Sequence, residues 1–172
     1  DIQAFKPSVL LVVPRVLEKV YNAASSKAGG GIKGRMFAWS DKQARTYSLA
    51  SEKTFGPGPF KKIRHGIADA LVLKKIRSVL GPNLRYIVSG GAPLATDLAH
   101  FYAGMGLTLI QGYGLSETTG PIAVQHIGKN PVGGVGLPLP GNFIKIAKDG
   151  EILVRGQSVM PGYYHLPEQT AE

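Results

Sequence analysis

Two short apolar runs that each end in closely spaced glycines constrain the fold more than any other feature. Residues 84–91 read LRYIVSGG and residues 107–114 read LTLIQGYG. Runs of this length that end in glycine predict buried strands leading into tight turns. The segment 94–102 between them predicts a helix that begins near a capping Thr96 and ends at Gly104. The order strand, helix, strand predicts a parallel α/β sheet, which binds ligands at the carboxyl ends of its strands.

The segments on either side predict different structures. Helices are expected from Pro14 to the glycines at 29–31, from Met36 to Lys53 and from Ile67 to Leu80, so the first half is predicted to be helical. The tract VGGVGLPLPG begins at 132, and FIKIAKDGEILVRG after it predicts a β-hairpin with Asp149-Gly150 as its turn.

The expected fold class is therefore α/β. It comprises a helical N-terminal half, a parallel β-α-β segment and then antiparallel hairpin or barrel-like strands. We expect two portions of one larger domain, the helices and sheet at 1–131 and the β-rich part at 132–172.

Composition excludes several classes of protein. Hydrophobic residues make up 44% of the 172 residues and charged residues 18%, which is typical of a globular chain. No apolar run approaches the length of a membrane span, and the absence of cysteine excludes disulfides and thiolate metal sites. A cytoplasmic location is the default expectation. The missing initiator Met and the ending PEQTAE indicate a piece of a longer protein.

Charge is distributed unevenly along the chain. Residues 1–85 carry 16 lysines and arginines against 5 aspartates and glutamates, whereas residues 86–172 carry 4 against 6. A basic half could contact nucleic acid, anionic lipid or a polyanionic cofactor. Solvated faces of surface helices are the simpler explanation and the preferred one.

The stretch GYGLSETTG at 112–120 gathers several kinds of ligand-binding group. Gly112 and Gly114 allow the backbone to approach a ligand closely, and Tyr113 offers a flat face for a base. Ser116 and the two threonines after it can hydrogen-bond phosphate oxygens, and Glu117 is a hard oxygen ligand suited to Mg²⁺. Together they suggest a nucleoside phosphate, although a strand-end loop with a capping serine explains the residues equally well. Gln111 is expected to approach the same ligand.

This stretch resembles the signature Y-G-x-[ST]-E of the adenylate-forming (AMP-binding) superfamily. Three further segments match the same superfamily in the same order: VPRVLEKVY at 13–21, SGGAPL at 89–94 and GEILVRGQSVMPGYY at 150–164. The match spans most of the chain. Within the superfamily, ALVLKKIRSVLGPNLRYIVSGGAPL looks most like the long-chain fatty-acid–CoA ligases of bacteria, which are acyl-CoA synthetases.

The resemblance implies a role for each matching residue. Tyr113 would stack on adenine, and the turn formed by Gly91, Ala92 and Pro93 would line the adenine pocket. Ser116 would contact the phosphate, Glu117 would bind Mg²⁺, and Gly112 and Gly114 would border the acyl carbonyl. Ser116 and Glu117 are thus the implied catalytic residues, with Gly91, Ala92, Pro93, Tyr113, Gly114 and Ser116 binding nucleotide.

The implied reaction is activation of a fatty acid by ATP to acyl-AMP, followed by transfer to coenzyme A. The superfamily's T-S-G-T-T-G-x-P-K-G loop, its T-G-D aspartate and its C-terminal lysine are not in this sequence. We therefore expect the isolated segment to be inactive, and acyl-CoA formation by the purified 172-residue chain would contradict this.

Other interpretations stay open at this point. A fatty acyl-AMP ligase or an aryl-CoA ligase would carry the same motifs, and a basic module that binds nucleic acid without catalysis would explain the charge. The superfamily resemblance implies ATP, Mg²⁺, coenzyme A and a fatty acid, with no nucleic acid. It leaves open peripheral contact with a membrane and a homodimer.

Overall fold

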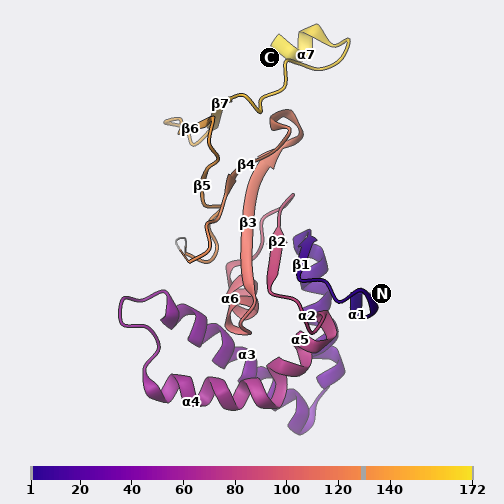
Figure 1. Cartoon of the computed structure of the whole chain (residues 1–172), viewed down its shortest axis with the longest axis vertical. Coiled ribbons are helices and arrows are strands. Elements are labelled where there is room, and N and C mark those ends of the chain that lie inside the picture. The colour runs from indigo at the N-terminus through magenta and orange to yellow at the C-terminus, as the bar shows by residue number, and fades with distance from the viewer. Residues whose placement is uncertain (1, 129–130, 172) are drawn as a thin grey trace.

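The computed structural model describes residues 2–128 and 131–171 (Figure 1). Helices gather at one end of an elongated molecule, and strands lead from them toward a hairpin and the C-terminal helix at the other end. The helices are α1 (Ile2–Phe5), α2 (Pro14–Ala28), α3 (Gly31–Ser51), α4 (Pro59–Ala68), the π-helix η1 (Asp69–Leu73), α5 (Lys74–Leu80), α6 (Thr96–Gly104), the 3₁₀ turn η2 (Ser116–Thr118) and α7 (Pro167–Ala171). The strands are β1 (Val9–Val12), β2 (Tyr86–Ser89), β3 (Thr108–Leu115), β4 (Gly120–Val124), β5 (Leu137–Pro138), β6 (Asn142–Ile146) and β7 (Ile152–Gly156).

The central sheet has the order β1-β2-β3-β4-β5, and its first three strands are parallel. The predicted β-α-β unit is confirmed as β2-α6-β3. The predicted helical first half is confirmed, and it also contains one strand that the sequence did not predict, since Val9–Val12 forms β1 and pairs with β2. A four-residue apolar run directly before a helix carries no periodicity of its own, so only the long-range pairing identifies it as a strand.

Three helix boundaries also differ from the predictions. Helix α3 begins at Gly31 rather than Met36, and the helical rod expected from Ile67 begins at Pro59 and continues through η1 to Leu80. Pro59 stands in the first turn of α4, where its missing N–H costs nothing. Thr96 is the first residue of α6 rather than its cap, and Ala95 precedes it without a side-chain hydrogen bond.

The second part of the chain is antiparallel, as predicted. Strands β3, β4 and β5 form an antiparallel run, and β6 pairs with β7 in a separate two-stranded hairpin whose turn contains Asp149-Gly150. The proposed division at 131/132 stays a prediction, and residues 129–130 beside it lie outside the described part of the chain. Within residues 2–128 and 131–171, no helix has the length and apolar character needed to cross a membrane.

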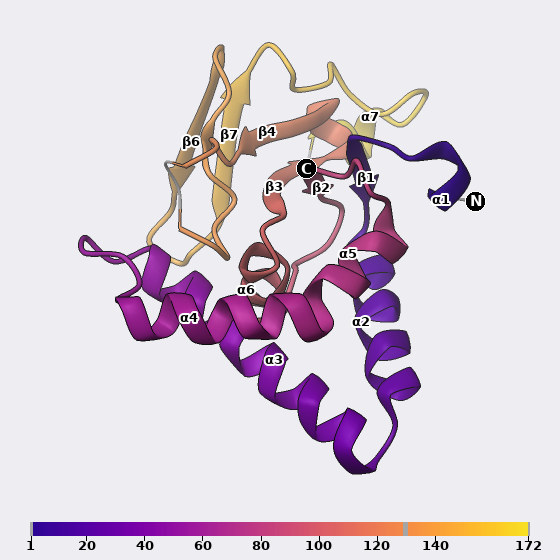
Figure 2. The same cartoon turned by 60° about the horizontal axis from the view of Figure 1, so that its bottom comes forward.

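Helix α6 lies at the centre of the hydrophobic core, between the sheet and α3 (Figure 2). Phe101 and Tyr102 are fully buried, and the Tyr102 hydroxyl donates a hydrogen bond to the Leu17 carbonyl at 2.8 Å. Burial raises the pKa of Tyr102. A hydrogen bond of 3.0 Å joins His100 to Ser48 of α3, so this histidine has the structural role of a satisfied core residue.

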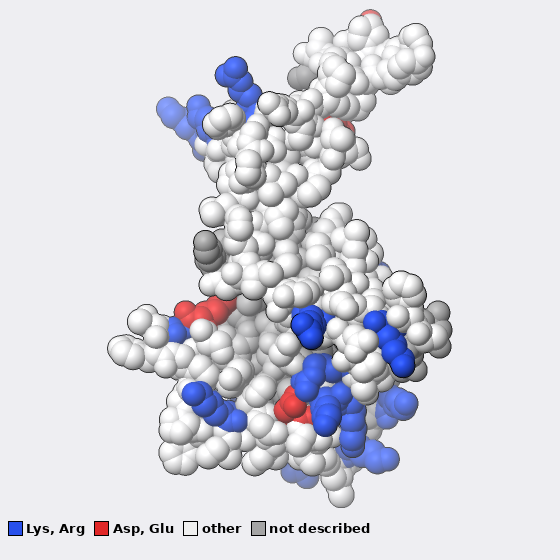
Figure 3. Space-filling model, in the orientation of Figure 1, with Lys and Arg blue, Asp and Glu red and all other residues white. Residues whose placement is uncertain are grey.

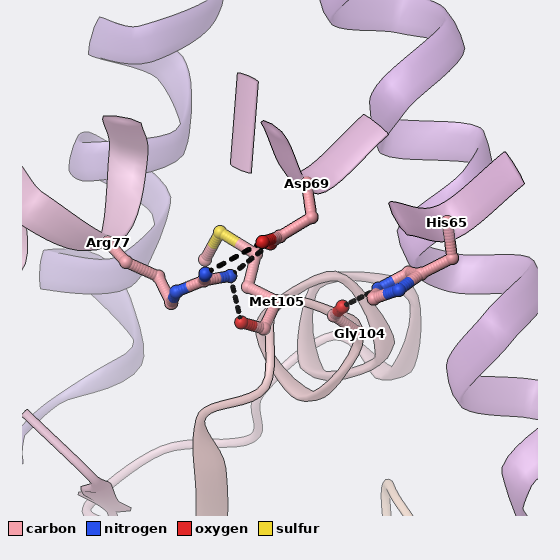
Figure 4. A network of polar contacts seen from close by, with 5 residues as sticks. All are labelled: His65, Asp69, Arg77, Gly104 and Met105. Atoms are coloured by element: carbon pink, nitrogen blue, oxygen red, sulfur yellow. Dashed lines mark hydrogen bonds and ion pairs between the residues drawn. The ribbon is translucent and has the colours of Figure 1, made fainter. Parts of the chain in front are cut away.

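The C-terminal end of α6 is held by polar side chains from α4, η1 and α5 (Figure 4). Arg77 donates hydrogen bonds to both oxygens of Asp69 and to the Met105 carbonyl, and a 2.6 Å hydrogen bond joins His65 Nε2 to the Gly104 carbonyl. The hydrogen bond from Arg77 holds the pKa of Asp69 below its usual value, against the effect of burial. These donors satisfy carbonyls that a helix end leaves without intrahelical partners, and they fix the position of α6.

The crossing of α3 over α6 requires glycine at position 104. A Cβ atom on Gly104 would lie 2.1 Å from the Ala44 carbonyl oxygen, which is backbone and cannot swing away. We predict that Gly104→Ala lowers the free energy of unfolding by about 3 kcal/mol or more, because the helices must separate. Gly66→Ala in α4 is the matched control. No atom lies within 4 Å of a Cβ there, so this change should leave stability equal or higher.

Chemical denaturation of the two variants measures both effects. Equal stability of Gly104→Ala and the unmodified protein would show that the close crossing does not exist in solution.

Candidate functional site

The two glycine-containing motifs lie side by side at one edge of the sheet. Strands β2 and β3 are parallel neighbours in which Ser89 pairs with Gln111, so Gly90 and Gly112 follow at the same level. A Cβ on Gly90 would lie 3.6 Å from the Gly112 carbonyl oxygen, which places the two backbones in contact. The carboxyl ends of the parallel strands therefore bring SGGAP and GYGLSE together, as the sequence predicts.

The SGGAP turn presents its backbone to the surface. Gly91 has a φ of +80°, a conformation that side chains rarely adopt, and Ala92 and Pro93 are exposed. Leu94 is buried in the core, and α6 begins at Thr96. The turn is thus anchored on both sides, by β2 before it and by α6 after it.

The GYGL part of the second motif is the last part of a strand, as expected from the predicted strand at 107–114, and the turn begins only at Ser116. Strand β3 continues to Leu115 by leaving β2 and pairing antiparallel with β4, with a register irregularity between Tyr113 and Gly114. A Cβ on Gly114 would lie 2.0 Å from the Gly120 carbonyl oxygen. Gly114 is therefore required by the packing of β3 on β4, whatever else it contacts.

The turn SET contains a hydroxyl that is committed to the fold. Thr118 is buried, and its Oγ1 accepts a hydrogen bond from the Leu115 N–H at 2.8 Å and lies 2.8 Å from the Gly120 carbonyl oxygen. Thr119 donates to the Ser158 carbonyl at 2.8 Å. Both threonines were expected to bind phosphate, but the structure uses these hydroxyls to shape the turn.

Ser116 and Glu117 remain accessible on the same turn. Ser116 is exposed, and its hydroxyl makes no hydrogen bond to any described residue. Glu117 is half-buried, and its carboxylate is held by a hydrogen bond of 2.8 Å from the Tyr163 hydroxyl. The turn therefore offers one free hydroxyl and one oriented carboxylate to a ligand.

Tyr163 belongs to a segment that folds back onto the turn. The Met160 N–H donates to the Glu117 carbonyl at 2.8 Å, and the hydroxyl of Thr170 accepts from the Tyr163 N–H at 2.9 Å. Sequence reasoning assigned no role to Tyr163, although it lies in the GYY element that carried part of the family resemblance. Its position beside Glu117 depends on a contact across 46 residues, which no local pattern indicates.

Hydrogen bonds keep the Glu117 carboxylate ionised. The donors are its own backbone N–H first and then the Tyr163 hydroxyl, and together they lower the pKa of Glu117. The same contact raises the pKa of Tyr163, because the phenol donates its proton to a carboxylate. An ionised carboxylate is the form that binds a divalent cation.

Two buried polar groups at the base of the site have no partner in the described structure. They are Ser89 Oγ, at the end of β2, and Gln111 Nε2, in the middle of β3, on residues that pair in register. The Gln111 backbone is fixed on its other side, since its N–H donates to Gln125 Oε1 at 2.9 Å. Unused hydrogen-bonding capacity beneath the two motifs is a feature of a site that receives a polar ligand or water.

The donor set is compatible with Mg²⁺ shared with a phosphate. Among residues 2–128 and 131–171 there is no group of three or more histidines, cysteines, aspartates and glutamates that could hold a metal alone. Mg²⁺ is usually bound by one or two carboxylates together with substrate phosphates, and Glu117 beside Ser116 provides this arrangement.

The chain belongs to the family of AMP-binding enzymes, whose family model matches residues 1–164. It is 48% identical over 168 residues to the long-chain-fatty-acid–CoA ligase FadD15 of Mycobacterium tuberculosis, covering 98% of this chain and 28% of the relative. It is 34% identical over 189 residues to long chain acyl-CoA synthetase 8 of Arabidopsis thaliana, covering 100% of this chain and 26% of the relative. The chain therefore spans little more than a quarter of the length of these relatives.

Solved structures confirm the fold class. The anthranilate CoA ligase AuaEII in complex with anthranoyl-AMP matches 98% of this chain and 25% of its own, with a TM-score of 0.54 and 16% identity. A benzoate CoA ligase from Burkholderia xenovorans LB400 matches 96% of this chain and 26% of its own, with a TM-score of 0.52 and 17% identity. At these identities the likeness shows the fold alone.

The hydrogen bond between Tyr163 and Glu117 can be tested by titration. We predict that Tyr163→Phe raises the pKa of Glu117, because one of the two donors to the carboxylate is lost. A carboxyl pKa that is lower in the folded than in the unfolded state stabilises the fold above the unfolded value of about 4.3. That stabilisation is lost as pH falls from the unfolded pKa through the folded pKa, so in the variant it should be smaller and should be lost completely at a higher pH.

Carboxyl-carbon NMR of Glu117 measures the shift directly. Tyr164→Phe is the control, because Tyr164 is 87% exposed and makes no hydrogen bond to Glu117. An unchanged Glu117 pKa in Tyr163→Phe would mean that the contact does not persist in solution.

Proposed function

We propose that this chain forms the nucleotide-binding part of a long-chain fatty-acid–CoA ligase. Such an enzyme activates a fatty acid with ATP and passes the acyl group to coenzyme A. The main support is the 48% identity to FadD15, which extends over both motifs that the sheet brings together. The activity is proposed for a longer protein that contains this segment, since the relatives are more than three times its length.

Adenine recognition is assigned to the two motifs on the sheet edge. The ring of Tyr113 would stack on the base, and the backbone of Gly91, Ala92 and Pro93 would border it on the other side. The turn at 90–93, exposed at 91–93, lies beside Gly112 and supports this role, because a bound base must be contacted on both faces and must be able to enter from solvent. Gly112 and Gly114 would border the acyl carbonyl. For Gly114 this applies only to the side of the residue that does not pack against β4.

Phosphate chemistry is assigned to the SET turn. The fatty-acid carboxylate attacks the α-phosphorus of ATP, the bond to pyrophosphate breaks and acyl-AMP forms. The Ser116 hydroxyl would donate to a phosphate oxygen, and Glu117 would hold Mg²⁺, which offsets the negative charge of the phosphates when it is bound. The hydrogen bond from Tyr163 orients the Glu117 carboxylate for this purpose.

The second half-reaction transfers the acyl group. The sulfur of coenzyme A attacks the acyl carbonyl, and the carbon–oxygen bond to AMP breaks. A fatty acyl-AMP ligase would share the first half-reaction and differ in its acceptor, and an aryl-CoA ligase would differ in its acid. The names of the relatives favour long-chain acids and coenzyme A.

Carboxylate-dependent exchange of pyrophosphate into ATP by the full-length protein tests the proposal. Exchange should rise from short-chain to long-chain fatty acids. Glu117→Ala should lower it by about a hundredfold or more, because the transition state loses its metal-binding carboxylate. Glu151→Ala is the matched control, since Glu151 is an exposed carboxylate on the β6–β7 loop, and it should exchange normally.

Three results would contradict the proposal. Absence of exchange with any carboxylic acid would exclude the ligase activity and favour a non-catalytic module that binds a nucleotide or uses its basic surface to bind nucleic acid. An equal loss in Glu117→Ala and Glu151→Ala would leave the SET turn without a specific role. Formation of acyl-AMP without acyl-CoA would identify the carrier-loading alternative.

A further inference from the structure

Helix α4 carries large apolar side chains on the face that points away from the core. Phe60 is 82% exposed, Ile63 62% and Ile67 49%. Their spacing of three and then four residues places them on one side of the helix. The opposite side packs against α3 and contains Ala68, which is fully buried, and the half-buried His65. The apolar stripe therefore faces solvent, the reverse of the usual arrangement for a surface helix.

The stripe continues beyond both ends of α4. Phe55, in the loop between α3 and α4, is 99% exposed, and Leu71 in η1 is 42% exposed. We call Phe55, Phe60, Ile63, Ile67 and Leu71 the outer stripe. An exposed apolar row of this length is unusual on a soluble surface and indicates a contact partner.

Cations lie along the outer stripe, and the acidic residue that follows α4, Asp69, is paired with Arg77. Lys61, Lys62 and Arg64 are exposed, and none of them takes part in an ion pair with a described residue. Helix α4 contains no aspartate or glutamate, and Lys53 and Lys74 extend the positive charge at either end. Figure 3 shows lysines and arginines spread over the helical half of the molecule and a second group at the end that carries the β6–β7 hairpin.

The outer stripe is remote from the candidate functional site. Helix α4 packs against α3 at the helical end, whereas the SET turn lies toward the opposite end of β3 (Figures 1 and 2). A ligand of the site therefore cannot cover it. A purely apolar stripe would suit a protein partner, but aromatic and aliphatic side chains interleaved with unpaired cations match the interface of an anionic membrane.

We propose that the outer stripe docks the protein on an anionic lipid surface. Phe55, Phe60 and Ile63 enter the boundary between headgroups and acyl chains, while Lys61, Lys62 and Arg64 contact lipid phosphates. This inference concerns a surface distinct from the nucleotide site, and it does not depend on the proposed ligase activity.

Cosedimentation of the full-length protein with vesicles tests the docking. One vesicle population is pure phosphatidylcholine, and the other contains about 30% phosphatidylglycerol. The protein should bind the anionic vesicles, bind the neutral ones much less, and be released progressively as salt rises. Binding to neither population, or equal binding to both that salt does not alter, would overturn the proposal.

Matched substitutions locate the contact. Ile63→Glu should weaken partitioning by at least about tenfold, because it removes apolar contact and adds a repelled charge. Ile146→Glu in β6 is its control, since Ile146 is 61% exposed, and it should bind as the unmodified protein does. Lys61→Glu/Lys62→Glu should weaken binding by at least about 25-fold, at about fivefold for each cation lost. The control Lys145→Glu/Lys148→Glu changes two exposed cations in or near β6, and it should weaken binding far less.

An environment-sensitive fluorophore on Ile63→Cys distinguishes the other occupants of this surface. Its emission should shift to the blue when anionic vesicles are added. A label site that is inaccessible before vesicles are added would show that other parts of the protein cover the stripe. A lower oligomeric state in Ile63→Glu, by light scattering, would assign the stripe to self-association. Either result, or equal losses in Ile63→Glu and Ile146→Glu, would overturn the membrane proposal.

Discussion

Helices α3 and α6 cross so closely at Gly104 and Ala44 that no side chain fits between their backbones. This contact determines where α6 lies, and the rest of the core is arranged around it. Tyr102 reaches across to α2, and Arg77 and His65 hold the carbonyls at the end of the helix. Because α6 begins directly after the SGGAP turn, the clamp on its C-terminal end also fixes the turn that forms one wall of the candidate site.

Much of the fold follows from local patterns, and the exceptions share a physical cause. The glycine-terminated runs predict β2 and β3, and the Asp149-Gly150 turn predicts the β6–β7 hairpin, because periodicity and turn chemistry are encoded in neighbouring residues. Strand β1 is too short to carry a pattern and exists through its pairing with β2. The start of α4 at Pro59 was missed because a GPGP tract indicates a break, although proline is well suited to a first helical turn.

The candidate site shows the same division between local and long-range information. Residues of GYGLSE and SGGAP could be selected from the sequence, since their residue types suit a nucleotide and its metal. The roles of Gly114 and Thr118 could not, because they depend on how β3 meets β4. The contact of Tyr163 with Glu117 joins two motifs that are distant along the chain. A substitution at Tyr163 in the later motif is therefore expected to change the environment of the Glu117 carboxylate in the earlier one.

Strand β3 pairs in parallel with β2 along its first half and antiparallel with β4 along its second half, and these two pairings are expected to form at different times during folding. Its second half pairs with β4 across a tight connection, so that Gly114 meets Pro121 and Leu115 meets Gly120. Its first half pairs with β2, which in turn needs β1 from near the start of the chain. Pairings between near neighbours lose less chain entropy than distant ones and form sooner. The GYGLSE segment is therefore expected to form early, as part of the local β3–β4 hairpin. The SGGAP turn on the other side of the site is expected to form later, when β2 pairs with β1 and β3.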